Sequence, residues 1–186
     1  MPYWVLYLPP WGGRKEVTEL KRRGNVAPLA LSFSAAFLVG LVLVGVTWGA
    51  PRDLRLPSLI GAQEVSLEAF AGRPTLLIFW TVRCPYCKKE LLELKELLSS
   101  RDLSFNVVAI AYARGESEVE ETRKWVEGNG PFRGVEFLLD SDGKAFAQHD
   151  VRFVPHNVVL GPDLQVRKVI PGAVPPSLLI EEIEGS

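Results

Sequence analysis

The sequence is poor in cysteine and histidine, with two of each among 186 residues. Two cysteines are too few for a disulfide-stapled small domain, a four-cysteine zinc site or a cysteine-ligated iron–sulfur cluster. An excess charge of one sign is also lacking, since the formal net charge is −1. That balance gives no general attraction to nucleic acid. What the chain does have is one close cysteine pair, Cys84 and Cys87, a spacing typical of a redox pair or part of a metal site.

A long uncharged run near the N-terminus predicts a membrane anchor. No charged residue occurs between Arg23 and Arg52, and residues 29–50 are almost wholly apolar. A helix of this length spans about 33 Å, enough to cross the hydrocarbon core. Basic residues are more frequent before the run than after it. We therefore predict a cytoplasmic segment at 1–25, a transmembrane anchor at 27–50 and an extracytoplasmic C-terminal part, which places the protein as a single-pass protein in the cell membrane.

A cleaved signal peptide is the alternative reading of this run. Trp48 and Pro51 do not fit a small-residue cleavage site after Ala50, and the run is longer than a usual signal core. No cysteine ends the run, which excludes a lipoprotein anchor. These features favour an uncleaved anchor.

The rest of the chain alternates between strand-like and helix-like segments. Residues 51–63 are interpreted as a linker and residues 64–186 as one domain. Strands are predicted at 75–80, 106–111 and 135–139, with a hairpin of 157–160 and 165–170. Helices are predicted at 65–70, 85–99, 116–127, 144–149 and 178–183. This order predicts an α/β domain whose mixed sheet has helices on both faces.

The cysteine motif lies where a buried strand ends and a helix begins. The first turn of a helix has unpaired N–H groups and the positive end of the helix dipole, and both stabilise a thiolate. We therefore expect a lowered pKa for Cys84, which makes it the attacking nucleophile, with Cys87 one turn further in to resolve a mixed disulfide. Pro85 suits the first helical turn. Arg83 either lowers the Cys84 pKa further or is simply solvated.

Half of a zinc site is the alternative for this motif. The chain has no second cysteine pair, and its histidines, His149 and His156, lack the usual ligand spacing. The strand before the motif, the helix after it and the extracytoplasmic location favour the redox reading.

Residues 78–90, Ile-Phe-Trp-Thr-Val-Arg-Cys-Pro-Tyr-Cys-Lys-Lys-Glu, resemble the active-site stretch of thioredoxin-fold proteins, especially the membrane-anchored TlpA/ResA/CcmG-type family. The resemblance covers roughly residues 55–184. It includes the segment 67–74 before the first core strand, the acidic turn 140–143 and residues 151–155, which are similar to the cis-proline loop of the family. It implies a thioredoxin fold.

The resemblance also implies roles for several residues. Pro155 would be the cis-proline, and Val154 before it would pair with an incoming peptide; the alternative is an ordinary trans proline opening an edge strand. Further residues expected to face the substrate are Trp80, Arg83, Pro85 and Tyr86. Trp80 is also expected to pack in the core near the site.

Four positions depart from the family or need a role. Arg83 stands where a tryptophan is usual, and Ile78 replaces the buried aspartate of thioredoxin. Glu90 matches an acidic residue of ResA-type proteins that tunes the thiols or relays a proton; as a bare sequence feature it also fits a solvated helix face. His156 replaces a usual threonine and either tunes the thiolates or lies on the surface.

The resemblance implies a thiol–disulfide oxidoreductase that needs neither organic cofactor nor metal. Its expected partners are cysteines of exported proteins, including those of apocytochrome c, and an integral-membrane thiol–disulfide carrier. Three alternatives stay open: a copper-handling protein of the same fold, a peroxiredoxin-like peroxidase using Thr81, and a binding module that has lost turnover. The Pro-Tyr dipeptide and Arg83 both favour a potential less reducing than that of thioredoxin.

Overall fold

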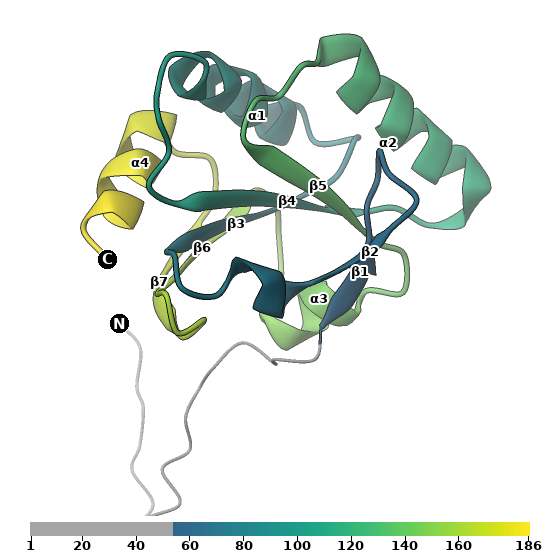
Figure 1. Ribbon diagram of the computed structural model, residues 1–186. Helices are drawn as coiled ribbons and strands as arrows, with labels where there is room; N and C mark the ends of the chain where they lie inside the picture. Colours follow the sequence, from purple (N-terminus) through teal and green to yellow (C-terminus); the bar gives the residue numbers. More distant parts are fainter. Residues whose placement is uncertain (1–53) are drawn as a thin grey trace, which may run out of the picture. The chain divides into compact units, whose positions relative to one another are not determined.

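A five-stranded mixed sheet is the centre of the computed structural model, which describes residues 54–186 (Figure 1). The strands lie in the order β5-β4-β3-β6-β7. Their bounds are β3 Thr75–Trp80, β4 Asn106–Tyr112, β5 Val135–Asp140, β6 His156–Leu160 and β7 Val166–Pro171. Strands β3, β4 and β5 run parallel to one another, whereas β6 is antiparallel to both β3 and β7. The predicted mixed sheet and terminal hairpin are confirmed.

The predicted cytoplasmic segment 1–25 and membrane anchor 27–50 lie outside the described residues. Between residues 54 and 186, no helix combines the length and the apolar character that a membrane crossing requires.

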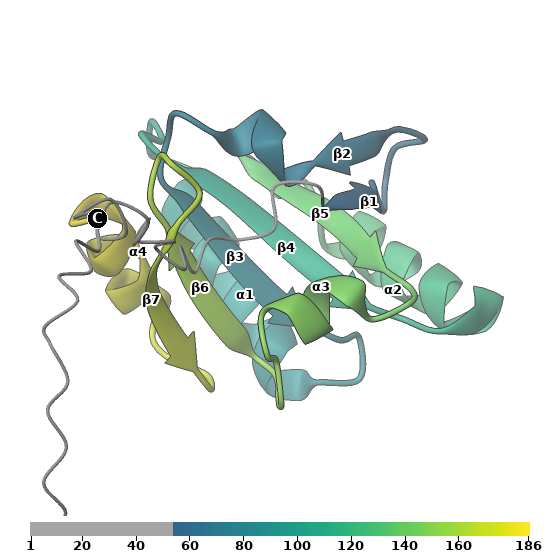
Figure 2. The same ribbon diagram turned by 90° about the horizontal axis from the view of Figure 1, so that it is seen from below.

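Helices cover both faces of the sheet, as predicted. On one face lie α1 Pro85–Leu98, α2 Gly115–Asn129 and α4 Pro176–Glu184, which share a core cluster with Ile78 and Trp80 of β3. On the other lie α3 Lys144–Gln148 and a 3₁₀ helix at Leu67–Phe70, which pack near Leu77 and Phe79. Figure 2 shows α3 in front of the sheet with α1 and α2 behind it. Because side chains alternate along β3, the strand supplies both clusters and is wholly buried.

The entry to the domain differs from the prediction. A strand β1, Arg55–Pro57, lies inside the segment interpreted as a linker and pairs with β2, Glu64–Ser66. Leu54, Leu56 and Leu59 are buried, and this burial holds the segment against the sheet. The helix predicted at 65–70 is correct only from Leu67 onward, because Val65 and Ser66 belong to β2. Three-residue strands carry too little periodicity to be recognised from sequence.

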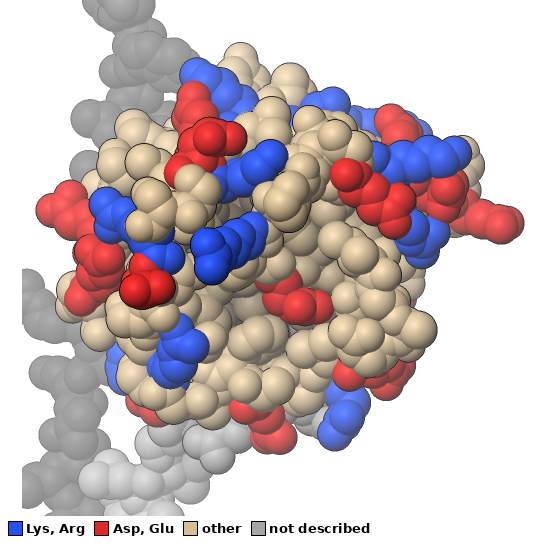
Figure 3. Space-filling model, turned by 45° about the horizontal axis from the view of Figure 1, so that its top comes forward, with Lys and Arg blue, Asp and Glu red and all other residues tan. Residues whose placement is uncertain are grey.

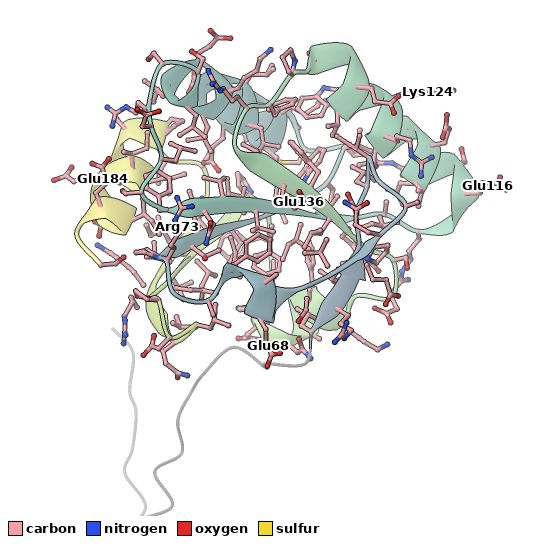
Figure 4. All side chains as sticks on the ribbon, viewed as in Figure 1. Glu68, Arg73, Glu116, Lys124, Glu136 and Glu184 are labelled. Carbon is pink, nitrogen blue, oxygen red and sulfur yellow. A yellow bond between two sulfur atoms is a disulfide. The ribbon has the colours of Figure 1, made fainter. Side chains whose placement is uncertain are left out.

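Arg73 fixes the start of β3 relative to the chain that leads into β4 (Figure 4). Its guanidinium donates hydrogen bonds to the backbone oxygens of Leu103, Ser104 and Phe105. The planar group has five N–H donors, so one side chain can satisfy three carbonyls. The strand that carries the cysteine motif is thereby held at its opposite end.

Candidate active site

The two cysteines form a disulfide at the junction of β3 and α1. Cys84 is the N-cap of α1, and its Sγ accepts a hydrogen bond of 3.0 Å from the backbone N–H of Cys87. Pro85 occupies the first helical turn. The Cα atoms of the two cysteines are 5.3 Å apart. The predicted strand–motif–helix arrangement is confirmed, with a backbone N–H aimed at the sulfur that would carry negative charge after reduction.

The two sulfurs differ in accessibility. Cys84 is partly exposed, whereas Cys87 is fully buried in the core cluster beneath it. Because an incoming thiolate must reach a sulfur along the S–S axis, this difference favours attack at Cys84. The assignment of Cys84 as nucleophile and Cys87 as resolving cysteine remains a prediction that this burial supports.

The loop before β6 brings a backbone carbonyl to the disulfide. The Val154–Pro155 peptide bond is cis, as the resemblance implied. The carbonyl oxygen of Val154 lies 3.8 Å from the Sγ of Cys84. Pro155 is buried, and its own oxygen accepts a hydrogen bond of 2.9 Å from the N–H of Gly172 just after β7. Segments about 70 positions apart therefore meet at the disulfide.

Two aromatic side chains near the disulfide are exposed. Tyr86, between the cysteines, is 67 % exposed, and Phe153, before Val154, is 57 % exposed. Trp80 is fully buried and stacks at 5.2 Å from Trp125 between ring centroids. The expectation that Trp80 contacts substrate is therefore wrong for direct contact, because its ring is covered by the core on all sides. Its packing role is confirmed.

Arg83 is directed toward α2 as well as toward solvent. Its Nε lies 3.4 Å from Oε1 of Glu118, and its side chain is 73 % exposed. A cation that is both paired and exposed is strongly screened, so its influence on the neighbouring Cys84 is small. Figure 3 shows Lys and Arg side chains interspersed with Asp and Glu over the visible face, with no field of one sign.

Glu90 is buried beneath the motif, one turn after Cys87 on α1, and is 2 % exposed. Its Oε1 accepts a hydrogen bond of 3.2 Å from Nδ2 of Asn157, and its Oε2 accepts one of 3.1 Å from the N–H of Val174. Burial raises the pKa of Glu90, although both hydrogen bonds oppose this. The alternative of a solvated helix face is wrong, because the helix turns this position toward the sheet.

His149 and His156 lie on the other face of the sheet and pack around Phe79. The ring centroids are 5.1 Å and 6.1 Å from that of Phe79. His156 is 6 % exposed, so the alternative of a surface histidine is wrong. Burial lowers the pKa of His149 to about 4, and burial also lowers the pKa of His156. Both imidazoles are therefore neutral at pH 7.

Two residues of the site were not identified from the sequence. Asn157 follows the cis-proline by two positions and holds the Glu90 carboxyl. Val174 contributes only a backbone N–H, which leaves no sequence signal. Asn157 did carry a signal, since a polar amide interrupts the otherwise apolar run of residues 157–160.

The redox-active cysteine pair lies at the N-terminus of a helix, and a loop with a cis-proline lies beside it. This arrangement defines the chain as a thioredoxin-like thiol–disulfide oxidoreductase. The chain belongs to the AhpC/TSA family, whose model matches residues 50–169.

The chain is similar to known proteins in both sequence and structure. The chain is 30 % identical over 122 residues to an uncharacterized protein of Haemophilus influenzae, covering 64 % of this chain and 77 % of that protein. It is 25 % identical over 114 residues to sporulation thiol-disulfide oxidoreductase A of Bacillus subtilis, covering 61 % and 67 %. A secreted disulfide oxidoreductase of Mycobacterium tuberculosis, homologous to E. coli DsbE, has a TM-score of 0.61 at 22 % identity, covering 72 % and 96 %. This last likeness supports the fold.

Proposed function

We propose that this protein exchanges electrons with cysteines of exported proteins through the Cys84–Cys87 disulfide. The observation that carries the proposal is the position of the Cys84 sulfur, 3.8 Å from the Val154 oxygen in a loop with an exposed aromatic side chain. An extended peptide laid along this loop can pair with the Val154 backbone while its cysteine reaches Cys84. Tyr86 and Phe153 provide apolar contacts on the exposed surface nearby.

The exchange takes place in two steps. A substrate thiolate attacks Sγ of Cys84, which forms a mixed disulfide and breaks the Cys84–Cys87 bond; the electron pair of the broken bond stays on Cys87 as a thiolate. A second substrate thiolate then attacks the substrate sulfur of the mixed disulfide and releases Cys84. The substrate is oxidised to a disulfide and the protein is reduced to a dithiol. The reverse sequence reduces a substrate disulfide.

Glu90 would supply the proton that the leaving Cys87 thiolate needs. It lies three residues after Cys87, so the two side chains share one face of α1. Burial keeps part of the Glu90 population neutral at a pH where an exposed glutamate is ionised. Transfer of that proton yields a neutral Cys87 thiol and a Glu90 carboxylate, and solvent restores the proton through the small cavity that Glu90 lines.

The proposed location is the outer side of the cell membrane, with residues 27–50 as an uncleaved anchor. The sequence pattern of residues 1–55 supports this orientation. The likeness to a secreted oxidoreductase is in keeping with it. In this location electrons would pass to or from an integral-membrane thiol–disulfide carrier, and apocytochrome c cysteines are one substrate class.

The rates at which the reduced protein is oxidised by a peptide disulfide and by hydrogen peroxide distinguish thiol–disulfide exchange from peroxide reduction. We expect the reduced protein to be oxidised by a cysteine-containing peptide disulfide at least about 100-fold faster than by hydrogen peroxide at equal concentration, because the exposed sulfur lies beside a peptide-pairing carbonyl. The measurement is stopped-flow tryptophan fluorescence of the full chain. Faster oxidation by peroxide would replace the proposal by the peroxidase alternative.

The proposed orientation predicts how the cysteines react in intact cells. A membrane-impermeant maleimide should label reduced Cys84 in the full-length protein without cell lysis, since the domain would face outward. A cytoplasmic protein with a free thiol serves as the unlabelled control, and Cys84→Ser as the background. Labelling that appears only after lysis would place the domain on the cytoplasmic side.

A further inference from the structure

The buried pair Glu90 and Asn157 joins helix α1 to the sheet beneath the disulfide. Asn157 is fully buried on β6, directly opposite Ile78 of β3 and on the face that α1 covers. Its Nδ2 donates to Oε1 of Glu90, and Val174 donates to Oε2. Within residues 54–186 these are the two hydrogen bonds of the Glu90 carboxyl. Both partners are donors, which suits a carboxylate and leaves a carboxylic acid without an acceptor for its O–H.

The Asn157 amide holds the missing acceptor. Its Oδ1 is buried and has no hydrogen-bond partner among the described residues. The two ends of a side-chain amide have nearly the same size and shape, so a half-turn of the amide exchanges them at little steric cost. After that rotation, Oδ1 faces Glu90 and accepts its O–H. One end of the amide lacks a partner in either orientation: the oxygen before the rotation and the NH2 group after it.

We propose that Asn157 is a positioning residue that holds the Glu90 carboxyl in both protonation states by reversing its side-chain amide. The proposal rests on the proposed function in that Glu90 must gain and lose a proton during each exchange. A partner with only donors would favour the carboxylate, and an apolar partner would favour the acid. Asn157 lets the carboxyl change charge without moving away from Cys87.

Among residues 54–186, no side chain other than Asn157 makes a hydrogen bond to the Glu90 carboxyl. Tyr86, Lys89 and Glu93 of α1 line the same cavity of about 260 Å³, together with residues 173–175. Glu93 acts on Glu90 through its charge, which raises the Glu90 pKa. Ile78 of β3, opposite Asn157, has an apolar side chain. The amide of Asn157 is therefore the polar side chain from the sheet that meets Glu90.

The first test is a pH titration of the oxidised full chain by NMR. We expect the side-chain amide resonances of Asn157 to titrate with the same midpoint as the ¹³C carboxyl resonance of Glu90. Contacts between the Nδ2 protons and α1 should be present above that midpoint and lost below it. In Glu90→Gln the Asn157 titration should disappear. An Asn157 amide that keeps one orientation throughout, while Glu90 titrates, overturns the proposal.

The second test uses a matched pair of substitutions. Asn157→Leu keeps the size but removes both donor and acceptor, and it should raise the Glu90 midpoint by about one pH unit, since the hydrogen bond lost is stronger to the carboxylate. Asn106→Leu is the control. It removes an amide of β4 that donates to the Phe70 oxygen and to the Thr75 hydroxyl, away from Glu90, and it should shift the midpoint by less than about 0.3 unit. Equal shifts in the two variants contradict the proposal.

The catalytic consequence is read in the same variants. In Asn157→Leu, the limb of the pH–rate profile that follows Glu90 should move to higher pH by the same amount as the NMR midpoint. In a protein that already carries Glu90→Gln, adding Asn157→Leu should leave the pH–rate profile unchanged. A purely structural role would change stability in both backgrounds and leave the limb in place. Because the NMR titration needs no substrate, it stands or fails independently of the proposed exchange with exported proteins.

Discussion

Replacement of Cys84 by serine is expected to lower the rate of thiol–disulfide exchange by at least about a thousandfold, because a serine hydroxyl is neither a nucleophile nor a leaving group in this chemistry. Replacement of Cys87 by serine should have a different result. The first step survives in Cys87→Ser, since partly exposed Cys84 is intact, but the mixed disulfide then lacks its internal resolving thiol. Cys87→Ser should therefore accumulate a covalent complex with its substrate.

The measurement is mass spectrometry of protein incubated with a peptide disulfide, after the remaining thiols are blocked. We expect the peptide mass on Cys84 in the Cys87→Ser protein and no adduct in Cys84→Ser. Cys84→Ser/Cys87→Ser serves as the matched control for non-covalent retention. Accumulation of the adduct on Cys87 in Cys84→Ser would reverse the assigned roles, and it would contradict the inference drawn from the burial of Cys87.

The parts of the fold that could be predicted are those whose periodicity is strong. Strand β3 is a continuous apolar run, and α1 repeats Leu91, Leu94 and Leu98 on one face. The cysteine motif between them could be placed because the strand end and the helix start are both evident in the sequence. The β1–β2 hairpin could not be predicted, because its pairing depends on burial of Leu54 and Leu56 against residues far along the chain.

The electrostatic part of the site depends on tertiary contacts in the same way. Lys88, Lys89 and Glu90 are consecutive charged residues, and only the rotation of α1 against the sheet decides that Glu90 is the buried one. His156 follows a proline, as a residue at the start of an edge strand often does. In the structure β7 is the edge strand of the sheet, and β6, which carries His156, lies next to it on the inner side. Local sequence does not encode which strand is central and which is at the edge.

His149 and His156 make the domain sensitive to acid. His149 has a pKa of about 4 in the folded protein and about 6.5 when unfolded. Between these values the unfolded chain binds a proton that the folded chain does not, so the free energy of unfolding falls as pH falls from about 6.5 toward 4. Over the interval from pH 7 to 4.5 His149 alone is expected to remove roughly 2–3 kcal/mol of stability.

The lowered pKa of His156 also reduces the free energy of unfolding as the pH falls. The raised pKa values of Glu90 and Asp140 increase it as the pH falls, because their carboxyls bind protons more readily in the folded protein. The contribution of His149 is therefore measured as the difference in stability loss between the wild type and a variant that lacks this imidazole.

The comparison uses His149→Phe, which keeps an aromatic ring in contact with Phe79 and cannot be protonated. Urea unfolding of the oxidised protein at pH 7 and 4.5 should show the variant losing roughly 2–3 kcal/mol less than the wild type over this interval. His156→Phe is the matched control and should recover less, since the charge of Asp150 opposes the lowering of the His156 pKa and no such charge acts on His149. If His149→Phe lost as much stability as the wild type, the imidazole would already be protonated in the folded domain, and the ring would have to face water rather than Phe79.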